Sequence, residues 1–186
     1  MKLQNIFLSQ LSQLLVKRNF FDSRWIKNIK MDKVEAIEAI LPLKVRGEII
    51  KGFGRGSREL GFPTANFSQE VIEGVPEAIV GGIYCGFAQV DQGPVHDMVM
   101  SVGWNPFYNN EKRAMETHII HKYDGDLYGR TLSVIIVGYL RPEANYESLE
   151  SLVKAIEGDI DNGKKRNQDP KCSVFKDDPF FQQQSS

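Results

Sequence analysis

The stretch from Gly52 to Asn66 has the sequence GFGRGSRELGFPTAN, a glycine-rich segment followed directly by Pro-Thr-Ala-Asn. Glycines admit positive φ and let backbone N–H groups approach an anion, while Arg55 and Arg58 add positive charge. Thr64 and Asn66 are two residues apart, so in an extended segment both side chains point to one face, where a hydroxyl and an amide carbonyl can bind a hard cation. The stretch therefore predicts a phosphate and metal site of the kind that holds magnesium on a nucleotide.

Better-known phosphate motifs do not fit this stretch. Gly56 and Gly61 have the Walker A spacing, but Phe62 and Pro63 follow where that loop needs Lys and then Ser or Thr. The dinucleotide fingerprint and the protein-kinase loop both need glycine at position 57, which is Ser57. A glycine cluster taken alone is more often a turn than an ATP loop, and it is the adjoining Pro-Thr-Ala-Asn that favours the nucleotide interpretation.

Composition indicates one ordinary globular domain. The chain has 186 residues, of which 41% are hydrophobic, enough for a core, and its net charge of −1 gives no reason to expect nucleic acid. Cys85 and Cys172 are 87 positions apart and do not have metal-ligand spacing, which favours free thiols in a reducing compartment. We expect no membrane span, because no apolar run is long enough.

Short strand-like segments separated by turns begin at residue 45, a pattern that favours an all-β barrel over a doubly wound sheet. The expected strands span residues 45–51, 82–90, 96–104, 114–121 and 131–140, with turns at 91–94, 105–106 and 124–126. After Pro142 the apolar period becomes helical, through Leu149, Leu152, Val153, Ile156 and Ile160. This period predicts one amphipathic helix that closes the domain, with Asn145 as its N-cap.

The first thirty residues differ in charge from the rest. They hold six of the 23 Lys and Arg residues but only one of the 24 acidic residues, Asp22. Leu3, Phe7 and Leu11 fall on one helical face, as in an organelle-targeting helix, although a helix packed on the barrel fits equally well. We therefore expect residues 1–40 to form an N-terminal helical extension and 41–186 the barrel domain. The expected location is cytoplasmic, or mitochondrial or otherwise organellar if residues 1–30 act as a targeting segment.

Five blocks of the chain, taken in order, resemble the eukaryotic single-function riboflavin kinases. They are residues 47–67, 82–84, 101–106, 115–121 and 137–142, and the resemblance covers about residues 43–180. It implies a mainly β fold, a six-stranded antiparallel barrel of the Greek-key type with a helix packed against it. It also implies transfer of the γ-phosphate of ATP to the 5′-hydroxyl of riboflavin, which forms FMN and ADP. The sequence lacks a His-x-Gly-His adenylyltransferase signature and an Asp-x-Asp-Gly-Thr phosphatase signature, so we expect the reaction to stop at FMN.

The resemblance also implies the catalytic residue. In the block Met115-Glu116-Thr117-His118, the glutamate is the catalytic residue of the family, so Glu116 is expected to accept the proton of the attacking hydroxyl. On sequence alone, a surface glutamate on a barrel strand would be the simpler interpretation. His118 shares the strand face of Glu116 and is expected to be structural.

Nucleotide and metal residues follow from the same resemblance. It assigns ATP to Gly52, Arg58, Thr64, Asn66, Ile119, His121 and Tyr128, and it assigns the metal to Thr64 and Asn66. We expect Mg²⁺, with Zn²⁺ or Mn²⁺ as alternatives. A zinc site built from His118 and His121 is disfavoured, because residues three apart on a strand point to opposite faces.

The flavin site is expected at Arg141, Ala144 and Tyr146, although many relatives have a basic residue at the position of Ala144. Aromatic walls could come from Trp104, Phe107, Tyr108, Tyr139 or Tyr146, though each is more often a core residue. We expect a monomer that binds riboflavin and ATP. Two other classes stay open: a barrel that binds flavin or nucleotide without turnover, and a barrel that reduces flavin with a nicotinamide cofactor, which would not need Thr64, Asn66 and Glu116.

Overall fold

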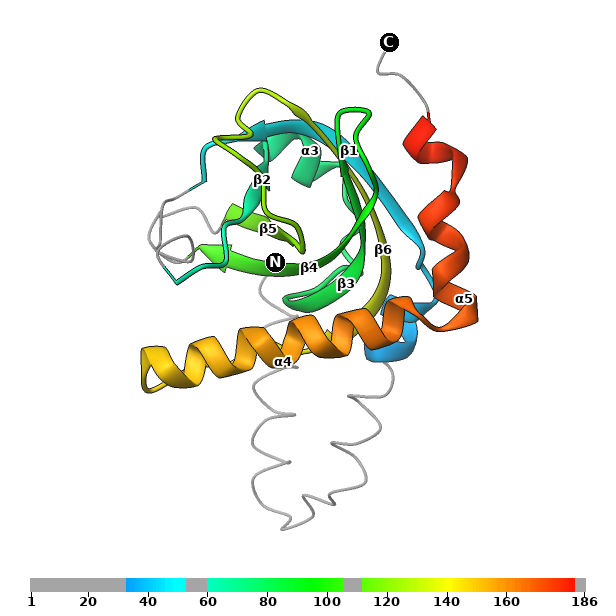
Figure 1. The fold of residues 1–186 in the computed structure, drawn as a ribbon. Coiled ribbons are helices and arrows are strands. Elements are labelled where there is room, and N and C mark those ends of the chain that lie inside the picture. Colours follow the sequence, from blue (N-terminus) through cyan, green and yellow to red (C-terminus); the bar gives the residue numbers. More distant parts are fainter. Residues whose placement is uncertain (1–32, 53–59, 106–111, 183–186) are drawn as a thin grey trace, which may run out of the picture. The chain divides into compact units, whose positions relative to one another are not determined.

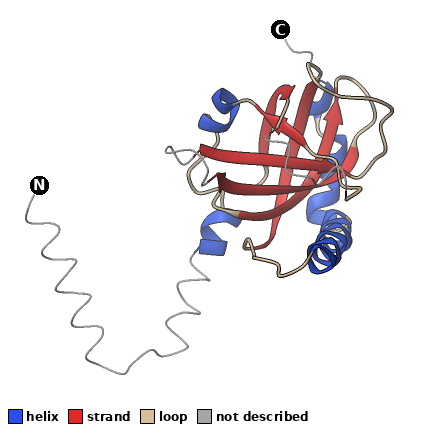
Figure 2. Ribbon diagram, turned by 90° about the vertical axis from the view of Figure 1, so that its left-hand side faces the viewer, coloured by secondary structure: helices blue, strands red, loops and turns tan. Residues whose placement is uncertain are grey.

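The strand-like segments form a closed antiparallel barrel in the computed structural model, which describes residues 33–52, 60–105 and 112–182. Its strands are β1 (Leu43–Ile50), β2 (Ala65–Phe67), β3 (Gly82–Val90), β4 (His96–Asn105), β5 (Lys112–Ile119) and β6 (Thr131–Arg141). Around the barrel they follow the order β1, β2, β5, β4, β3, β6, and β6 pairs with β1 to close it (Figure 1). Figure 2 shows the strands in red and the helices in blue outside them. The predicted six-stranded antiparallel barrel is therefore confirmed.

The two faces of the barrel wall are both apolar along β6. Leu132, Val134 and Ile136 belong to the core inside the barrel. Ile135 and Val137 belong to a second cluster on the outside. Because side chains alternate along a strand, a strand that is covered on both faces has a nearly continuous apolar sequence. Residues 131–140 could therefore be predicted as a strand from their nearly continuous apolar sequence, but not from an alternation of apolar and polar residues.

Helix α4 (Leu149–Asn167) lies across the outside of the barrel and packs on β3, β4 and β6 (Figure 1). Gly163 permits this close approach, because a Cβ atom at this position would lie only 2.8 Å from Cγ1 of Val99. The predicted amphipathic helix is thus confirmed, and it covers the outer face of the barrel.

The start of α4 differs from the prediction. Ser148 is the N-cap: its hydroxyl accepts a hydrogen bond from the backbone N–H of Ser151 at 3.1 Å, and Ser151 Oγ accepts one from the backbone N–H of Ser148 at 3.2 Å. This reciprocal pair satisfies two N–H groups that a helix leaves free. The prediction of Asn145 as N-cap was wrong, because residues 142–146 form an irregular segment between β6 and the helix.

Short helices complete the described part of the chain: α3 (Gln69–Glu73), α5 (Pro170–Ser173), η1 (Val174–Asp177) and η2 (Pro179–Gln182). The C-terminal helices are held beside β1 by polar contacts. Lys44 Nζ lies 2.8 Å from an oxygen of Asp178, and the guanidinium of Arg46 donates to the carbonyl of Phe180 and lies 4.4 Å from its ring centroid. Through these contacts the C-terminal helices cover the outer face of β1, which the sequence pattern of β1 alone did not predict.

β5 ends earlier than the sequence predicted, and only part of the predicted N-terminal extension is described. β5 ends at Ile119 instead of at residue 121, because the backbone N–H of His121 donates to the carbonyl of Ile119 at 2.8 Å and turns the chain. Residues 33–38 are helical, whereas residues 1–32, which carry most of the predicted extension, lie outside the described residues. The division at residue 40 stays a prediction. Among the described helices, none is long and apolar enough to cross a membrane.

Candidate active site

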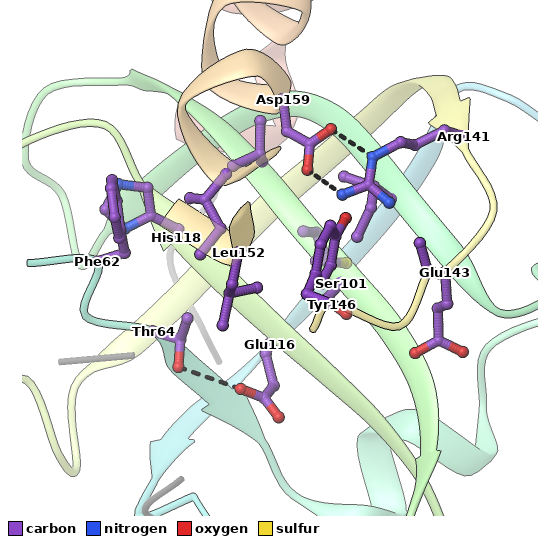
Figure 3. Close-up of a pocket in the computed structure, with 15 residues that line it drawn as sticks. Phe62, Thr64, Ser101, Glu116, His118, Arg141, Glu143, Tyr146, Leu152 and Asp159 are labelled. Atoms are coloured by element: carbon purple, nitrogen blue, oxygen red, sulfur yellow. Dashed lines mark hydrogen bonds and ion pairs between the residues drawn. The ribbon is translucent and has the colours of Figure 1, made fainter. Parts of the chain in front are cut away.

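A pocket of about 270 Å³ lies outside the barrel wall, between β4, β5 and α4 (Figure 3). Its apolar lining consists of Phe62, Ile83, Val99, Met100, Ala144, Leu152 and Ile156. Its polar lining consists of Thr64, Ser101, Glu116, His118, Arg141, Glu143, Tyr146 and Asp159. Small-molecule sites are usually about 300–1,000 Å³ and mostly apolar, with a few placed polar groups. The pocket is therefore close to the size and chemistry needed for a planar amphipathic ligand.

Pairing of β2 with β5 brings the predicted metal residues to the predicted base. Ala65 pairs with Thr117 and Asn66 pairs with Glu116, and residues directly opposite in an antiparallel pair share a face. Ala65 and Thr117 are buried, so Thr64, Asn66 and Glu116 lie on the outer face. The hydroxyl of Thr64 donates to Oε2 of Glu116 over 3.4 Å, a long hydrogen bond (Figure 3).

Gly52 lies against the side chain of Asn66. A Cβ atom at position 52 would lie 2.4 Å from Nδ2 of Asn66, so no larger residue fits there without movement. Within the described residues the side-chain amide of Asn66 has no hydrogen-bond partner. The structure thus brings Gly52, Thr64, Asn66 and Glu116 together, whereas Arg58 lies outside the described residues.

Of the predicted nucleotide residues that the structure describes, only Thr64 lines the pocket, whereas Gly52, Asn66 and three others do not. The side chain of Ile119 is 5% exposed and packs in the barrel core, so only its main chain can meet a nucleotide. Tyr128 is 48% exposed, and the N–H of the next residue, Gly129, donates to the carbonyl of Ile49 at 2.9 Å. That bond holds Tyr128 beside the end of β1, from which the chain continues to Gly52.

His121, the third of these residues, lies just beyond β5 in a stack of aromatic rings. Its ring centroid is 4.0 Å from that of His96, with nearly parallel planes, and Tyr123 meets it edge-on at 4.7 Å. Burial and the neighbouring His121 lower the pKa of His96. His118 on β5 instead lines the pocket, so the two histidines are separate, although His121 lies beyond the end of the strand and not on its opposite face.

The three predicted flavin residues all line the pocket. Arg141 at the end of β6 forms a bidentate ion pair with Asp159 of α4, with Nε–Oδ1 and Nη2–Oδ2 distances of 2.7 and 2.5 Å. This pair raises the pKa of the guanidinium. The guanidinium carbon lies 5.9 Å from the ring centroid of Tyr146, and Ala144 adds no polar group. In Figure 3 the Arg141–Asp159 and Thr64–Glu116 pairs are separate, and Tyr146 and Leu152 lie between them.

Of the five aromatic walls predicted from sequence, one lines the pocket, two do not, and two lie outside the described residues. Trp104 is 57% exposed and does not line the pocket, and Tyr139 packs edge-on against Tyr84 at a centroid distance of 5.2 Å. Phe107 and Tyr108 lie outside the described residues. Tyr146 is confirmed as a lining residue, and the other aromatic lining residues are Phe62 and His118, which pack edge-on at 5.7 Å.

Two acidic residues of the pocket were missed by sequence reasoning. Asp159 continues the stripe of Leu152 and Ile156 at helical spacing, so an acid on an apolar face was the signal that could have revealed it. Glu143 lies beside Gly103, where a Cβ atom would be 2.3 Å from its Oε1, and burial raises the pKa of Glu143. The sequence shows a glycine at position 103, but it does not show that Glu143, 40 residues away in the chain, lies beside it.

Comparison with known proteins agrees with this geometry. Residues 39–166 match the family model of flavokinase, riboflavin kinase. The chain is 55% identical over 142 residues to riboflavin kinases from Homo sapiens and Mus musculus, which covers 76% of this chain and 92% of theirs. Its structure is similar to the crystal structure of riboflavin kinase from Trypanosoma brucei, with a TM-score of 0.63, 26% identity, and coverage of 78% of this chain and 89% of that one. This chain therefore belongs to the riboflavin kinase family.

Proposed function

We propose that this chain transfers the γ-phosphate of ATP to the 5′-hydroxyl of riboflavin, forming FMN and ADP. Its family membership supports the reaction. The observation that carries the assignment is the position of Glu116, which lies at an apolar pocket and shares a strand face with Thr64 and Asn66. A base, two oxygen ligands and a slot for a flat ring are the parts that this reaction needs.

Glu116 is the proposed base. As the 5′-oxygen of riboflavin attacks the γ-phosphorus, the bond from phosphorus to the β,γ-bridging oxygen breaks, and the hydroxyl proton passes to the Glu116 carboxylate. Within the described residues the Glu116 carboxylate has no cationic partner, and Thr64 is the residue whose side chain donates a hydrogen bond to it, over 3.4 Å. It can therefore accept a proton without first breaking an ion pair. A positioned base of this kind contributes about 10²–10⁴-fold to the rate.

Thr64 and Asn66 are the residues that we propose hold a divalent cation, Mg²⁺, together with the phosphates of ATP. Their hydroxyl and amide oxygens are hard, neutral ligands, which suits an ion that keeps several waters and binds through few protein groups. The amide of Asn66, which has no hydrogen-bond partner within the described residues, fits this role. When bound, the ion would neutralise charge on the phosphoryl group. Among the described residues no cluster of three or more His, Cys, Asp or Glu could hold a metal, which disfavours zinc.

The isoalloxazine ring of riboflavin is proposed to occupy the apolar part of the pocket. Tyr146 and Phe62 offer aromatic surfaces, and Leu152 offers an aliphatic one. Arg141 donates hydrogen bonds to Asp159 through two of its N–H groups and to the carbonyl of Pro142 through a third, at 3.0 Å. These contacts, with the interaction of the guanidinium with the Tyr146 side chain, fix Arg141 at the wall of the pocket, where it can face acceptor atoms of the ring.

Incubation of the purified chain with riboflavin, ATP and MgCl₂, followed by chromatography, tests the proposal. We expect FMN and ADP in equal amounts and no FAD. A chain that quenches riboflavin fluorescence on binding but forms neither product would be a flavin-binding protein, and the proposed reaction would be wrong. Oxidation of NADPH by the chain with riboflavin present, without ATP consumption, would favour the reductase class instead.

We also propose that the chain is monomeric. Its proposed location is the cytoplasm, with organellar targeting by residues 1–30 as the alternative. Support for targeting is the charge of that segment, which holds six basic residues and one acidic residue. A fluorescent reporter fused behind residues 1–30 tests the location: a reporter that stays diffuse favours the cytoplasm. Light scattering at several protein concentrations tests the monomer, which should give about 21 kDa throughout.

A further inference from the structure

The Thr64 end of β2 is weakly held by strand pairing. β2 contains three residues, and its register with β1 ends where Asn66 pairs with Ile50. Beyond that point towards Thr64, β5 is the only neighbouring strand in the described part of the chain. Pro63 has no N–H group to donate to any neighbour. The separation between Thr64 and Glu116 therefore needs another constraint.

The side chain of His118 supplies a contact at this place. Its Nδ1 atom lies 2.9 Å from the carbonyl oxygen of Pro63, and its ring packs edge-on against Phe62 at a centroid distance of 5.7 Å. A carbonyl oxygen can only accept, so Nδ1 of His118 carries the proton and donates. One side chain of β5 is thus bound to both residues that precede Thr64.

We propose that His118 is a positioning residue, which fixes the segment leading to Thr64 against β5 and so sets the distance between Thr64 and Glu116. The Thr64–Glu116 contact, at 3.4 Å, is too long to set that distance by itself. The inference rests on the proposed roles of Thr64 and Glu116. It differs from them because His118 acts through the backbone of Pro63 and not on the substrate.

Two amide substitutions distinguish the hydrogen bond from His118 Nδ1 to the Pro63 carbonyl from the other properties of the imidazole ring. His118→Asn places an amide nitrogen near the position of Nδ1, where it can still donate to the Pro63 carbonyl. His118→Gln places its amide nitrogen one bond farther out, near the position of Nε2. Both variants lose the imidazole ring and its contact with Phe62 equally, so a difference between them reports the Nδ1 hydrogen bond. His118→Ala removes the donor entirely.

Turnover, Mg²⁺ dependence and hydrogen exchange are the three measurements. In His118→Ala and His118→Gln we expect kcat to fall about five- to tenfold and the Mg²⁺ concentration for half-maximal rate to rise by a similar factor, the effect of losing one hydrogen bond. His118→Asn should stay within about threefold of the natural chain, by the same reasoning. Amide exchange of a peptide spanning residues 60–67 should quicken in the Ala and Gln variants and not in the Asn variant.

A variant that is merely destabilised provides the control. Asn167 at the end of α4 donates to the carbonyl of Gly86 and to Asp97, both at 2.8 Å, and does not line the pocket. Asn167→Ala should lower the melting temperature while kcat and Mg²⁺ dependence stay unchanged, with all assays run well below the melting temperature of each variant.

Equal behaviour of His118→Asn and His118→Gln would overturn the proposal, as would a natural kcat and exchange rate in His118→Ala. A weaker riboflavin affinity in all three variants, with kcat and exchange unchanged, would also overturn it and make His118 a wall of the flavin pocket only. If the natural chain forms no FMN, the proposed reaction fails separately. The exchange comparison then still decides whether His118 holds the segment before Thr64.

Discussion

Replacement of Asp159 by Asn tests whether the Arg141–Asp159 pair holds α4 on the barrel and shapes the flavin pocket. The two oxygen atoms of Asp159 accept from Nε and Nη2 of Arg141 at 2.7 and 2.5 Å. Asn keeps the shape of the side chain but removes its charge and one of the two acceptors. The guanidinium then stays at the pocket without a carboxylate partner.

The expected cost follows from the burial of the pair. Removing one partner of a fully buried ion pair costs about 3–5 kcal/mol, because the other charge is left unpaired. The side chain of Asp159 is 8% exposed and that of Arg141 is 29% exposed, so water can partly solvate the guanidinium. We therefore expect a loss of about 2–3 kcal/mol in the free energy of unfolding. For a chain of this size the melting temperature should fall by about 5–10 °C.

The matched control is Lys154→Gln, on the same helix. The Lys154–Glu150 pair also joins two charges at 2.8 Å, but its side chains are 72% and 78% exposed. An exposed pair of this kind contributes at most about 0.5 kcal/mol. Urea unfolding and riboflavin fluorescence titration of both variants are the assays, and only Asp159→Asn should also bind riboflavin more weakly. If Asp159→Asn loses no more stability than Lys154→Gln, the reasoning from burial is wrong.

Three further predictions concern the site and the barrel end. Glu116→Gln should lower kcat by about 100-fold or more with riboflavin affinity largely kept, and near-normal turnover would remove Glu116 as the base. Thr64→Val and Asn66→Leu should each raise the Mg²⁺ concentration needed for half-maximal rate, because each loses an oxygen ligand; unchanged dependence in both would refute the metal assignment. Burial beside His121 lowers the pKa of His96, so the unfolded chain binds its proton more readily, and the free energy of unfolding should fall as the pH drops below about 6.5. In His96→Gln, denaturation curves at about pH 7.5 and about pH 5.5 should differ less than in the natural chain, and an equal difference would contradict the assignment.

The barrel could be predicted from sequence because its strands carry local signals. Residues 82–90, 96–104 and 131–140 combine apolar and β-branched side chains with turn residues at their ends, and β3, β4 and β6 form there. β2 was not among the expected strands, since Ala65–Phe67 is too short to show a period. Its extended backbone was nevertheless implied by placing Thr64 and Asn66 on one face. A long strand can be recognised from its own sequence, whereas a three-residue strand forms only because neighbouring strands pair with it.

The polar pairs of the pocket could not be predicted in the same way. Thr64 and Glu116 are 52 residues apart in the chain, and their contact depends on the register of β2 against β5. Arg141 was predicted at the flavin through the family resemblance, but its partner Asp159 lies on a helix whose docking face had to be known first. The N-cap was wrong for a related reason, because Asn145 and Ser148 are both good caps and the exit of β6 decides between them.

The position of the site outside the barrel follows from how the interior is filled. Tyr84, Met98, Met100 and Met115 are at most 1% exposed and occupy the barrel with other apolar side chains, so a flavin ring cannot enter. A ligand must therefore bind to the outer wall. Because side chains alternate between the two faces of a strand, the residues that precede and follow each core residue in the sequence point to that wall. On β5 these are the residues flanking Thr117, namely Glu116 and His118. A polar residue on the outer face of a barrel strand is ordinarily solvated. Helix α4 packs on the neighbouring strands β3, β4 and β6 (Figure 1), and its side chains Leu152, Ile156 and Asp159 join Glu116 and His118 in the wall of a pocket.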